Sequence, residues 1–420
     1  MGKILFISKN GDAYGLAMQL ADDGHEVFVY IKEPEAQMTG KRCKNPLTVD
    51  SWTQNLKGVD FVFFDMVGLG EIADRIKRAG IKVIGSSAYG DEAELERDIG
   101  QKLMEKYTDA LIPESKTFIS KSIEEGIAYV ESLDYPVVFK PLGNQFTSWT
   151  FVAKEDNNGL VSFMRSLRKK VDYVIQQKVS GVEISTEMWF DGNKGYAFNH
   201  TIEKKRFMEG DKGPNTGCSG NVVWPCGKDK LVQTLLLPLE QVLKGKYIGP
   251  VDVNSIVTEM GANFLEFTVR AGYDALQALL SGIDKKFEFI ESIASGKGEE
   301  PKFTSKYMTA LRISMAPYPG NDEKALKNLQ GLKVVDILPQ FKKSVWLSDV
   351  MIDEEGCPVL AGIDGVIGSV TATDDVMEKA LGAMYTVVEA IKINNDMQYR
   401  SDIGCGVQDG IDQLTKWGWL

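Results

Sequence analysis

The sequence has very few histidines and no paired cysteine motif, and these scarcities exclude several kinds of chemistry. Only two of its 420 residues are histidine, so neither a Ser-His-Asp hydrolase nor a His-rich zinc site is indicated. The five cysteines are odd in number and lack a C-x-x-C pair, as is typical of a reducing cytosol. We therefore expect a cytoplasmic protein whose chemistry depends on carboxylates, lysine, arginine and backbone amides.

Positive charge and long hydrophobic runs are also in short supply. Lysine and arginine number 48 against 59 aspartates and glutamates, a net charge of −11. Such a surface repels phosphate backbones, and no apolar run reaches the length that spans a bilayer. We expect small-molecule substrates, with no nucleic acid and no membrane as partners.

The first hundred residues alternate buried strands with helices. Strands are expected at 3–8, 26–31, 61–65 and 82–85, with helices at 13–21 and 71–78 between them. This order predicts an open, mostly parallel sheet. The loop after the first strand reads KNGD, which is not a dinucleotide fingerprint, and a plain tight turn is the simpler interpretation.

Beyond a helix expected at 92–107 the pattern changes. Strands at 115–119, 135–140, 150–153 and 173–178 flank helices at 123–132 and 158–169, which predicts a small α+β module. The segment GDKGPNTGCSG (210–220) is read as a loop, because its four glycines interrupt any periodicity. After about residue 300 the chain is rich in strands and ends in a helix expected at 375–394.

An acidic hairpin is expected between Gly249 and Gly272. Residues 251–258 and 264–269 read as two strands joined by a turn, and the strands carry Asp252 and Glu266 on opposite arms. If the arms pair, the two carboxylates can lie close together and would repel unless a cation sits between them. The hairpin thus predicts a Mg²⁺ site, although acids pointing into solvent would give the same pattern.

Three further features favour nucleoside triphosphate chemistry. Lys140 ends the buried strand PVVFK, where an ammonium needs an anionic partner. Glu183 opens another strand directly after Gly181, and the glycine-rich segment offers backbone amides to anions, although a loop without a role stays an alternative.

His200, on the strand before that segment, is interpreted as a structural histidine, with substrate contact as the alternative.

These motifs resemble those of the ATP-grasp superfamily, and within it the phosphoribosylamine–glycine ligase family. The most specific match is KKRFMEGDKGPNTG (204–217), which is similar to that family's segment ending in G-D-T-G-P-N-T-G. GVE (181–183), LEFTVRAG (265–272), PYPG (317–320) and YRSDIG (399–404) are similar to family segments in the same order. The resemblance therefore runs nearly from end to end.

The resemblance implies an ATP-grasp fold, mixed α/β and α+β, in three parts. Residues 1–105 would form the N-terminal α/β domain, 106–300 the ATP-grasp domain with a lid subdomain at about 114–180, and 301–420 a β-rich C-terminal α+β domain. It also implies a ligase that uses ATP and Mg²⁺, or Mn²⁺, to phosphorylate a carboxylate that an amine then attacks. The substrates would be a glycine-like amino acid and an amine, and the protein a monomer or a homodimer.

The resemblance also implies roles for individual residues. The resulting assignments are ATP phosphates at Lys140, Thr147 and Ser148; the adenine hinge at Gln176, Lys178 and Val179; the ribose at Glu183; and Mg²⁺ at Asp252, Glu266 and Thr268. Catalytic roles fall to Arg270, which would stabilise charge, and to Asp211. The substrate site would be formed by Asn215, Thr216, Gly217, Lys9, Asn10 and Gly11.

Several positions depart from the family pattern. The lid loop replaces a lysine with Thr147 and Ser148, and Thr268 stands where the family has an asparagine, a better Mg²⁺ ligand. Asp12 and Val366 stand where the family has arginines, which removes charge from the place of a sugar phosphate, and Lys9 compensates in part. Three readings stay open: glycinamide ribonucleotide synthesis in the purine pathway, a ligase with another amine or amino acid, and a non-catalytic nucleotide-binding protein.

Overall fold

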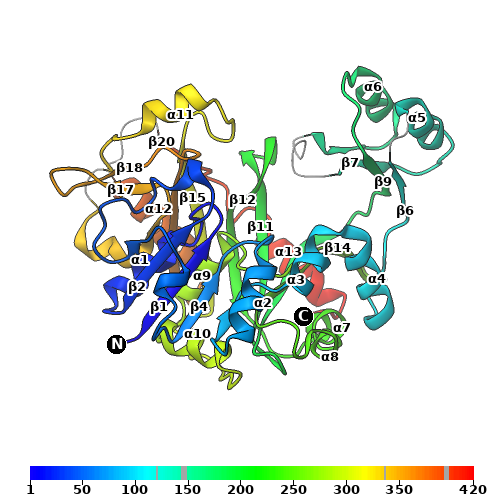
Figure 1. Cartoon of the computed structure of the whole chain (residues 1–420). Helices are drawn as coiled ribbons and strands as arrows, with labels where there is room; N and C mark the ends of the chain where they lie inside the picture. The colour runs from blue at the N-terminus through cyan, green and yellow to red at the C-terminus, as the bar shows by residue number, and fades with distance from the viewer. Residues whose placement is uncertain (120–121, 143–148, 335–336, 392–396) are drawn as a thin grey trace.

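The computed structural model of the chain describes residues 1–119, 122–142, 149–334, 337–391 and 397–420. These residues form a five-stranded sheet, a four-stranded sheet, a nine-stranded sheet and a two-stranded ribbon. Figure 1 shows the five-stranded sheet on one side of a central body, with the four-stranded sheet projecting from the other side. Across the described segments, no helix is both long and apolar enough to cross a bilayer.

The N-terminal sheet is parallel, with the strand order β3-β2-β1-β4-β5. Its strands are β1 (Lys3–Ser8), β2 (Glu26–Ile31), β3 (Leu47–Thr48), β4 (Phe61–Phe64) and β5 (Val83–Ile84), and its helices are α1 (Tyr14–Asp22) and α2 (Gly70–Arg78). All four residues of β4 are buried because both faces of the sheet are covered, which is why the strand reads as an unbroken hydrophobic run. The expected parallel sheet is confirmed.

The helix expected at 92–107 is in fact two helices, α3 (Ala88–Leu95) and α4 (Arg97–Tyr107). The chain leaves the helical conformation at Glu96, where φ is −98° and ψ is 87°. The two helices then approach closely at Gly100, where an added Cβ would lie 2.7 Å from the Ala93 carbonyl oxygen. The pattern of apolar residues continued through the break, so sequence periodicity could not reveal it.

The small sheet is antiparallel, with the strand order β6-β9-β7-β8, and confirms the expected α+β module. It contains β6 (Ser115–Phe118), β7 (Val137–Pro141), β8 (Phe151–Val152) and β9 (Tyr173–Gln177), and is covered by α5 (Ile123–Glu131) and α6 (Asn158–Ser166). Phe139 and Tyr173 stack in its core with ring centroids 4.9 Å apart. This module therefore has a core of its own.

The large sheet is antiparallel throughout and follows the order β14-β13-β10-β11-β12-β15-β19-β16, with β20 beside β15. Its strands are β10 (Val182–Phe190), β11 (Gly195–Met208), β12 (Lys212–Pro225), β13 (Gly249–Val257), β14 (Ala262–Thr268), β15 (Tyr307–Met315), β16 (Val345–Leu347), β19 (Val366–Asp374) and β20 (Met397–Gln398). β12 pairs with β15, so the sheet runs without interruption past residue 300. The hairpin expected at 251–269 is confirmed as β13 and β14.

The glycine-rich segment 210–220 is mostly strand, so the expectation of a loop is wrong for residues 212–220. It forms the first part of β12 and pairs with β11. The register shifts twice, between Lys204 and Arg206 and between Arg206 and Met208. Such bulges remove the alternation by which a strand is recognised, and glycine accommodates the resulting backbone, as at Gly213 with φ +74°.

The remaining elements cover the sheets. They are α7 (Lys230–Leu235), α8 (Leu239–Leu243), α9 (Ala275–Ser281), α10 (Lys286–Ala294), α11 (Glu323–Leu329), α12 (Met377–Ala390), α13 (Val407–Lys416) and the ribbon β17 (Val350–Ile352) and β18 (Pro358–Leu360). The helix expected at 375–394 appears as α12, and residues 392–394 lie outside the described residues. The sequence analysis missed α13, which packs against the large sheet together with the buried Trp419.

Candidate active site

One face of the large sheet carries a continuous array of polar side chains. Asp252 on β13 is in register with Glu187 on β10 and Thr268 on β14, and Asn254 is in register with Ser185 and Glu266. Residues paired in this way share a face of a sheet, and so do residues two apart along a strand. This face carries Glu183, Ser185, Glu187, Asn199, Thr201, Glu203, Asp252, Asn254, Glu266 and Thr268.

Asp252 and Glu266, the expected acidic pair, lie on this face but are not directly opposite each other. Asp252 faces Thr268, and Glu266 faces Asn254, because the register shifts by one residue next to Asn254. The two acids are therefore diagonal neighbours, a separation that long side chains can still bridge. Thr268, the third expected metal ligand, is the direct partner of Asp252.

Lys205 lies between the acids of two different strands. Its Nζ is 2.8 Å from Glu183 Oε1, 3.3 Å from Glu266 Oε1 and 3.3 Å from Asn254 Oδ1. Burial works against the charge of Lys205, but Glu183, Glu266 and Glu203 together raise its pKa well above the usual value. In turn, Lys205 lowers the pKa of Glu266.

Lys140, near the end of β7 in the small sheet, lies close enough to Glu266 and Glu183 for their charges to affect its pKa. Its Nζ donates to Gln176 Oε1 at 2.6 Å. Burial lowers the pKa of Lys140 to about 8, and Arg97 adds to that effect, while Glu266 and Glu183 oppose it. We call Lys140, Glu183, Lys205 and Glu266 the lysine cluster, because two ammonium groups and two carboxylates from both sheets interact there.

Two further acids on this face are the buried Glu187 and the half-buried Asp252. Burial raises the pKa of Glu187 to about 7. Burial also raises the pKa of Asp252 well above its usual value, with further contributions from Glu187 and Glu203. In the part of the chain that the structure describes, Asp252 Oδ1 is buried without a hydrogen-bond partner. Like charges side by side and an unpaired carboxylate oxygen both favour a cation at this place.

The donor atoms on this face suit a hard divalent cation. Asp252, Asn254, Glu266 and Thr268 all present oxygen, and Mg²⁺ binds oxygen ligands almost exclusively. The unpaired oxygen of Asp252 would gain a partner if an ion bound there. The residues present therefore fit the ion that the sequence predicts.

The expected adenine hinge connects the two sheets. Gln176 is buried at the end of β9 and binds Lys140, and the Lys178 ammonium donates to the Lys154 carbonyl at 2.6 Å. Val179 follows in the short link to β10, where Glu183 begins the polar face. Their roles stay predictions, and Thr147 and Ser148 lie outside the described residues.

Arg270 follows β14 and is held by Glu94 of α3. Arg270 Nε lies 3.0 Å from Glu94 Oε1, and Nη1 donates to the Ala271 carbonyl at 2.9 Å. Burial raises the pKa of Glu94 and the charge of Glu266 adds to that effect, whereas the charge of Arg270 partly opposes the raised pKa of Asp12. Arg270 is thus placed between the lysine cluster and a second group of acids.

This second group comes from three distant segments. Asp12 lies in the loop after β1, Asp65 follows β4, and Asp364 precedes β19, and we call these three residues the aspartate cluster. Burial raises the pKa of Asp12 to about 7, with Asp65 and Asp364 adding to it and Arg312 opposing it. Arg312 is already bound, with Nε 3.1 Å from Asp274 Oδ2. The expected substrate loop of Lys9, Asn10 and Gly11 precedes Asp12 directly.

The β11–β12 hairpin holds the remaining expected residues. Asp211, at φ +53°, pairs with Arg400 at 3.0 Å and with Lys204 at 3.3 Å. Thr216 donates to the Lys205 carbonyl at 3.0 Å and therefore helps to place Lys205 in the lysine cluster. Asn215 and Gly217 are exposed on either side of Thr216. The structure thus brings Thr216 close to the lysine cluster and engages Asp211 with the C-terminal segment.

Comparison with known proteins agrees with this geometry. Residues 97–274 match the family described as phosphoribosylglycinamide synthetase, ATP-grasp (A) domain. Phosphoribosylamine–glycine ligase of Streptococcus pneumoniae is 25% identical, with 96% of this chain and 99% of that protein aligned. The corresponding protein of Listeria monocytogenes is 27% identical over 79% of this chain and 84% of its own length.

This chain has an ATP-grasp fold, its residues 97–274 match an ATP-grasp domain, and it is similar along nearly its whole length to phosphoribosylamine–glycine ligases. Among solved structures, that ligase from Thermotoga maritima superimposes on this ATP-grasp chain with a TM-score of 0.70 and 16% identity, covering 95% of this chain and 99% of the other. Biotin carboxylase of Campylobacter jejuni, solved with β,γ-ATP, gives a TM-score of 0.64 and 14% identity, covering 99% and 97%. The expected ATP-grasp fold is therefore confirmed.

Sequence reasoning missed several residues of this candidate site. Lys205 lay within the segment 204–217 that carries the resemblance, but it was not given a role. Glu187 and Glu203 alternate with apolar residues along β10 and β11, and that alternation also fits an exposed face. Asp65 follows a hydrophobic strand of a parallel sheet, a position at which functional side chains are common, and this signal could have found it.

Proposed function

We propose that this chain is an ATP-dependent ligase that joins a carboxylate to an amine through an acyl phosphate. The γ-phosphoryl group of ATP passes to a carboxylate oxygen and ADP leaves. The amine nitrogen then attacks the acyl carbon, phosphate leaves, and the nitrogen loses a proton. The lysine cluster supports this proposal, because it joins two ammonium groups for phosphate to carboxylates for a metal ion across two sheets.

In the proposed enzyme, Lys140 and Lys205 bind ATP phosphates. Lys140 is oriented by Gln176, and Lys205 by Glu183 and Glu266, so both ammonium groups are positioned before ATP binds. The remaining nucleotide contacts that we propose are the adenine with Gln176, Lys178 and Val179, the ribose with Glu183, and the lid phosphate contacts with Thr147 and Ser148.

Asp252, Glu266 and Thr268, together with Asn254, would hold Mg²⁺ or Mn²⁺. When bound, the ion neutralises the phosphate oxygens during transfer. A bound ion would also offset the repulsion between Asp252 and Glu187. Lys205 would then shift from the carboxylates towards the phosphates.

Arg270 is the residue that we propose to stabilise charge on the transferring group. Its ion pair with Glu94 fixes the guanidinium, and a fixed cation costs little reorganisation when charge develops. Thr216, with Asn215 and Gly217, would receive the carboxylate substrate near Lys205. Asp211, already paired with Arg400, would act as a positioning residue for this hairpin.

The amine acceptor is the part of the reaction in which this chain departs from its relatives. The names of these relatives specify phosphoribosylamine and glycine as substrates. Here the loop of Lys9, Asn10 and Gly11 leads into the aspartate cluster, and Arg312 is already bound to Asp274. Acids repel a phosphate and attract a cation. We therefore favour a positively charged acceptor without a phosphate over phosphoribosylamine, which would place the enzyme outside purine biosynthesis.

The proposal is tested with ATP, Mg²⁺, glycine and a panel of amines. We expect ADP release to respond to a diamine or another cationic amine more strongly than to phosphoribosylamine. Hydroxylamine, which traps acyl phosphates as hydroxamates, should yield a hydroxamate from the carboxylate substrate alone. If ATP binds but neither ADP nor hydroxamate forms with any carboxylate, the chain is a binding protein. A strong preference for phosphoribosylamine would restore the purine-pathway reaction.

A further inference from the structure

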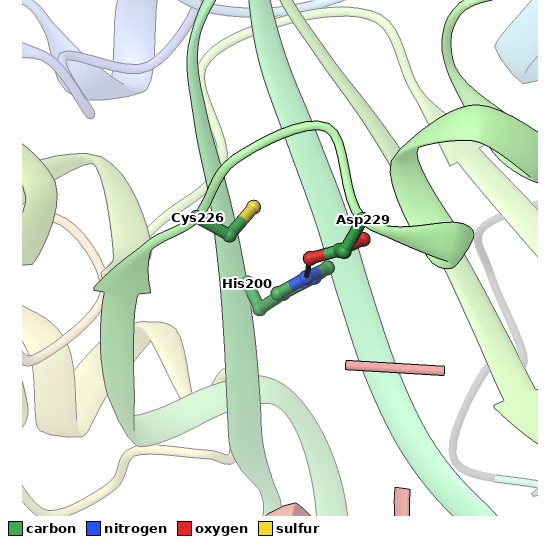
Figure 2. Close-up of side chains that lie close together, drawn as sticks. All are labelled: His200, Cys226 and Asp229. Carbon is green, nitrogen blue, oxygen red and sulfur yellow. Dashed lines mark hydrogen bonds and ion pairs between the residues drawn. The ribbon is translucent and has the colours of Figure 1, made fainter. Parts of the chain in front are cut away.

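The opposite face of the large sheet carries a group of side chains that the proposed reaction does not use. His200 lies on β11 between Asn199 and Thr201, and those two neighbours point to the face of the lysine cluster. His200 therefore points the other way. Figure 2 shows it converging with Cys226, which directly follows β12, and with Asp229, which directly precedes α7.

The three side chains offer nitrogen, sulfur and oxygen at short range. His200 Nε2 is 2.8 Å from Asp229 Oδ2, and the ligand atoms of all three residues lie within 4.8 Å of one another. The His200 side chain is fully buried, whereas Cys226 and Asp229 are partly exposed. A small ion could therefore reach the group from solvent and would meet a fixed imidazole on the inner side.

Two of the three groups, His200 and Asp229, are oriented by the surrounding structure. His200 Nδ1 lies 3.1 Å from the Thr186 hydroxyl, which fixes the plane of the ring. Asp229 Oδ1 accepts from the Val232 amide at 3.0 Å, so this oxygen caps α7 and leaves Oδ2 directed at His200. Cys226 and Asp229 are three residues apart across a turn, a spacing at which two ligands of one chain segment can share an ion.

We propose that His200, Cys226 and Asp229 form a zinc site, with water at the fourth position. Tetrahedral zinc places its nitrogen, sulfur and oxygen ligands at about 2.0 to 2.3 Å, hence about 3.3 to 3.8 Å from one another. The group needs only side-chain adjustments within the spacing that it already has. The sequence argued against a His-rich site, and this site uses a single histidine.

The protons of the site balance simply. On binding, the Cys226 thiol releases its proton to solvent and the sulfur binds zinc as a thiolate. Without zinc, His200 Nε2–H donates to the Asp229 carboxylate. On binding, this proton is lost from Nε2 and one is taken up at Nδ1 through solvent, so the neutral ring binds zinc through Nε2 and Nδ1–H donates to the Thr186 hydroxyl. Such a hydrogen bond from the second ring nitrogen is usual for a histidine that binds a metal. Asp229 binds through Oδ2 as a carboxylate.

The proposed zinc ion would link three elements, namely the middle of β11, the end of β12 and the beginning of α7. The His200–Asp229 hydrogen bond already links the first and third of these. Because metal-binding free energy adds to folding free energy, removing zinc should lower the unfolding temperature of the chain. This site does not depend on the proposed ligase activity, because its side chains face away from the lysine cluster.

The test measures zinc binding by the full chain without nucleotide. Metal-free protein, prepared with a chelator, is dialysed against Zn²⁺ in excess Mg²⁺, and bound zinc is measured by elemental analysis. We expect about one zinc ion per chain. Replacement by Co²⁺ should produce a thiolate-to-cobalt charge-transfer band in the near ultraviolet, which reports sulfur coordination directly.

The variants separate this site from other places where zinc could bind. Cys226→Ser should abolish the charge-transfer band and weaken zinc binding at least tenfold. Asp229→Asn keeps a residue that caps α7 but should weaken zinc binding in the same direction. The matched control is Cys357→Ser, because Cys357 also lies beside two acids, Asp353 and Glu355, but in a turn without histidine. This control should keep both the band and the affinity.

Three outcomes would overturn the zinc site. They are wild-type protein without stoichiometric zinc, a charge-transfer band that survives Cys226→Ser, or a band that disappears in Cys357→Ser. Zinc bound at the lysine-cluster face is recognised with Glu266→Gln, which should leave the band unchanged. Folding of each variant is checked by circular dichroism, so that loss of binding through unfolding is not mistaken for loss of a ligand.

Discussion

The lysine cluster and the aspartate cluster differ in how their charges are balanced. In the lysine cluster, Lys205 lies between Glu183 and Glu266, so that each charge has an opposite neighbour. In the aspartate cluster, Asp12 is surrounded by further acids, and the nearby Arg312 is already bound to Asp274. A site with both carboxylates and ammonium groups can bind a metal ion together with phosphates, whereas a site with an excess of carboxylates favours a cation. The comparison supports our proposal of an ATP-dependent ligase with a cationic acceptor in place of phosphoribosylamine.

The largest effect is expected from Glu266→Gln, which removes charge from the lysine cluster. Without this carboxylate, both the metal and Lys205 lose a partner, and we expect ADP formation to fall by about 100-fold or more. Glu259→Gln, in the exposed turn of the same hairpin, is the matched control and should leave the rate unchanged. Steady-state ADP release measures both. A loss of less than about threefold would show that the lysine cluster is not where ATP reacts.

Glu187→Gln tests whether buried charge is costly on the same face. Burial raises the pKa of Glu187 from 4.5 to about 7, so between those pH values the folded state binds more protons than the unfolded state. Wild-type stability must therefore fall as pH rises through this window. Above pH 7 the variant should gain up to about 3 kcal/mol in free energy of unfolding.

The measurement for Glu187→Gln is urea unfolding at pH 4.5 and pH 8 without divalent ions. The gain should be present at pH 8 and nearly absent at pH 4.5, where the wild-type carboxyl is largely protonated in the folded state. Glu299→Gln, at an exposed position, serves as the control. Equal effects of Glu187→Gln at both pH values would mean that charge is not what the variant relieves.

Asp12→Arg reverses one charge of the aspartate cluster. We expect kcat/KM for a cationic amine to fall at least about tenfold, because like charges then meet at the acceptor. Hydroxamate formation, which needs no amine substrate, should be unchanged. Asp50→Arg, at an exposed position of the same sheet domain, controls for the change of net charge. If phosphoribosylamine were the acceptor, Asp12→Arg would instead raise kcat/KM.

The effect expected to be smallest at neutral pH is a pH dependence of ATP use at Lys140. Its pKa is lowered to about 8, first by burial, so the ammonium is lost as pH rises past that value in the free enzyme. The kcat/KM for ATP should fall by about tenfold for each pH unit above 8. Lys140→Arg should remove this decline, because a guanidinium stays charged. A wild-type profile that is flat to pH 9.5 would exclude Lys140 from phosphate binding.

The sequence predicted the fold correctly where the local patterns of hydrophobic residues are strong. The hydrophobic run at 61–64 and the alternating, β-branched segment 251–258 each predicted a strand. Burial on both faces makes a strand hydrophobic throughout, and burial on one face makes it alternate, so both patterns are visible in the sequence. The candidate site was predicted from the sequence only in part. Asp252 and Glu266 were placed on one face, but the register shift beside Asn254 decides that Asp252 meets Thr268, and single-residue shifts leave no clear sequence signal.

The aspartate cluster shows why the rest could not be predicted. Asp12, Asp65 and Asp364 come from segments more than 50 residues apart, and each looks like an ordinary loop residue in its own segment. Their mutual repulsion arises only when the fold brings the three loops together. Lys205 could not be predicted for a different reason. In a bulged strand, neither spacing nor alternation distinguishes a lysine that points inward from one that points outward.

The pairing of β12 with β15 has a consequence for how this chain can be divided. Gly220 to Val223 bond to Met308 to Leu311, so the strand that begins with the glycine-rich segment is flanked on its far side by the C-terminal third of the protein. Cutting the chain near residue 300 would leave that row of amides and carbonyls open to self-association. A chain shortened in this way for expression should therefore precipitate.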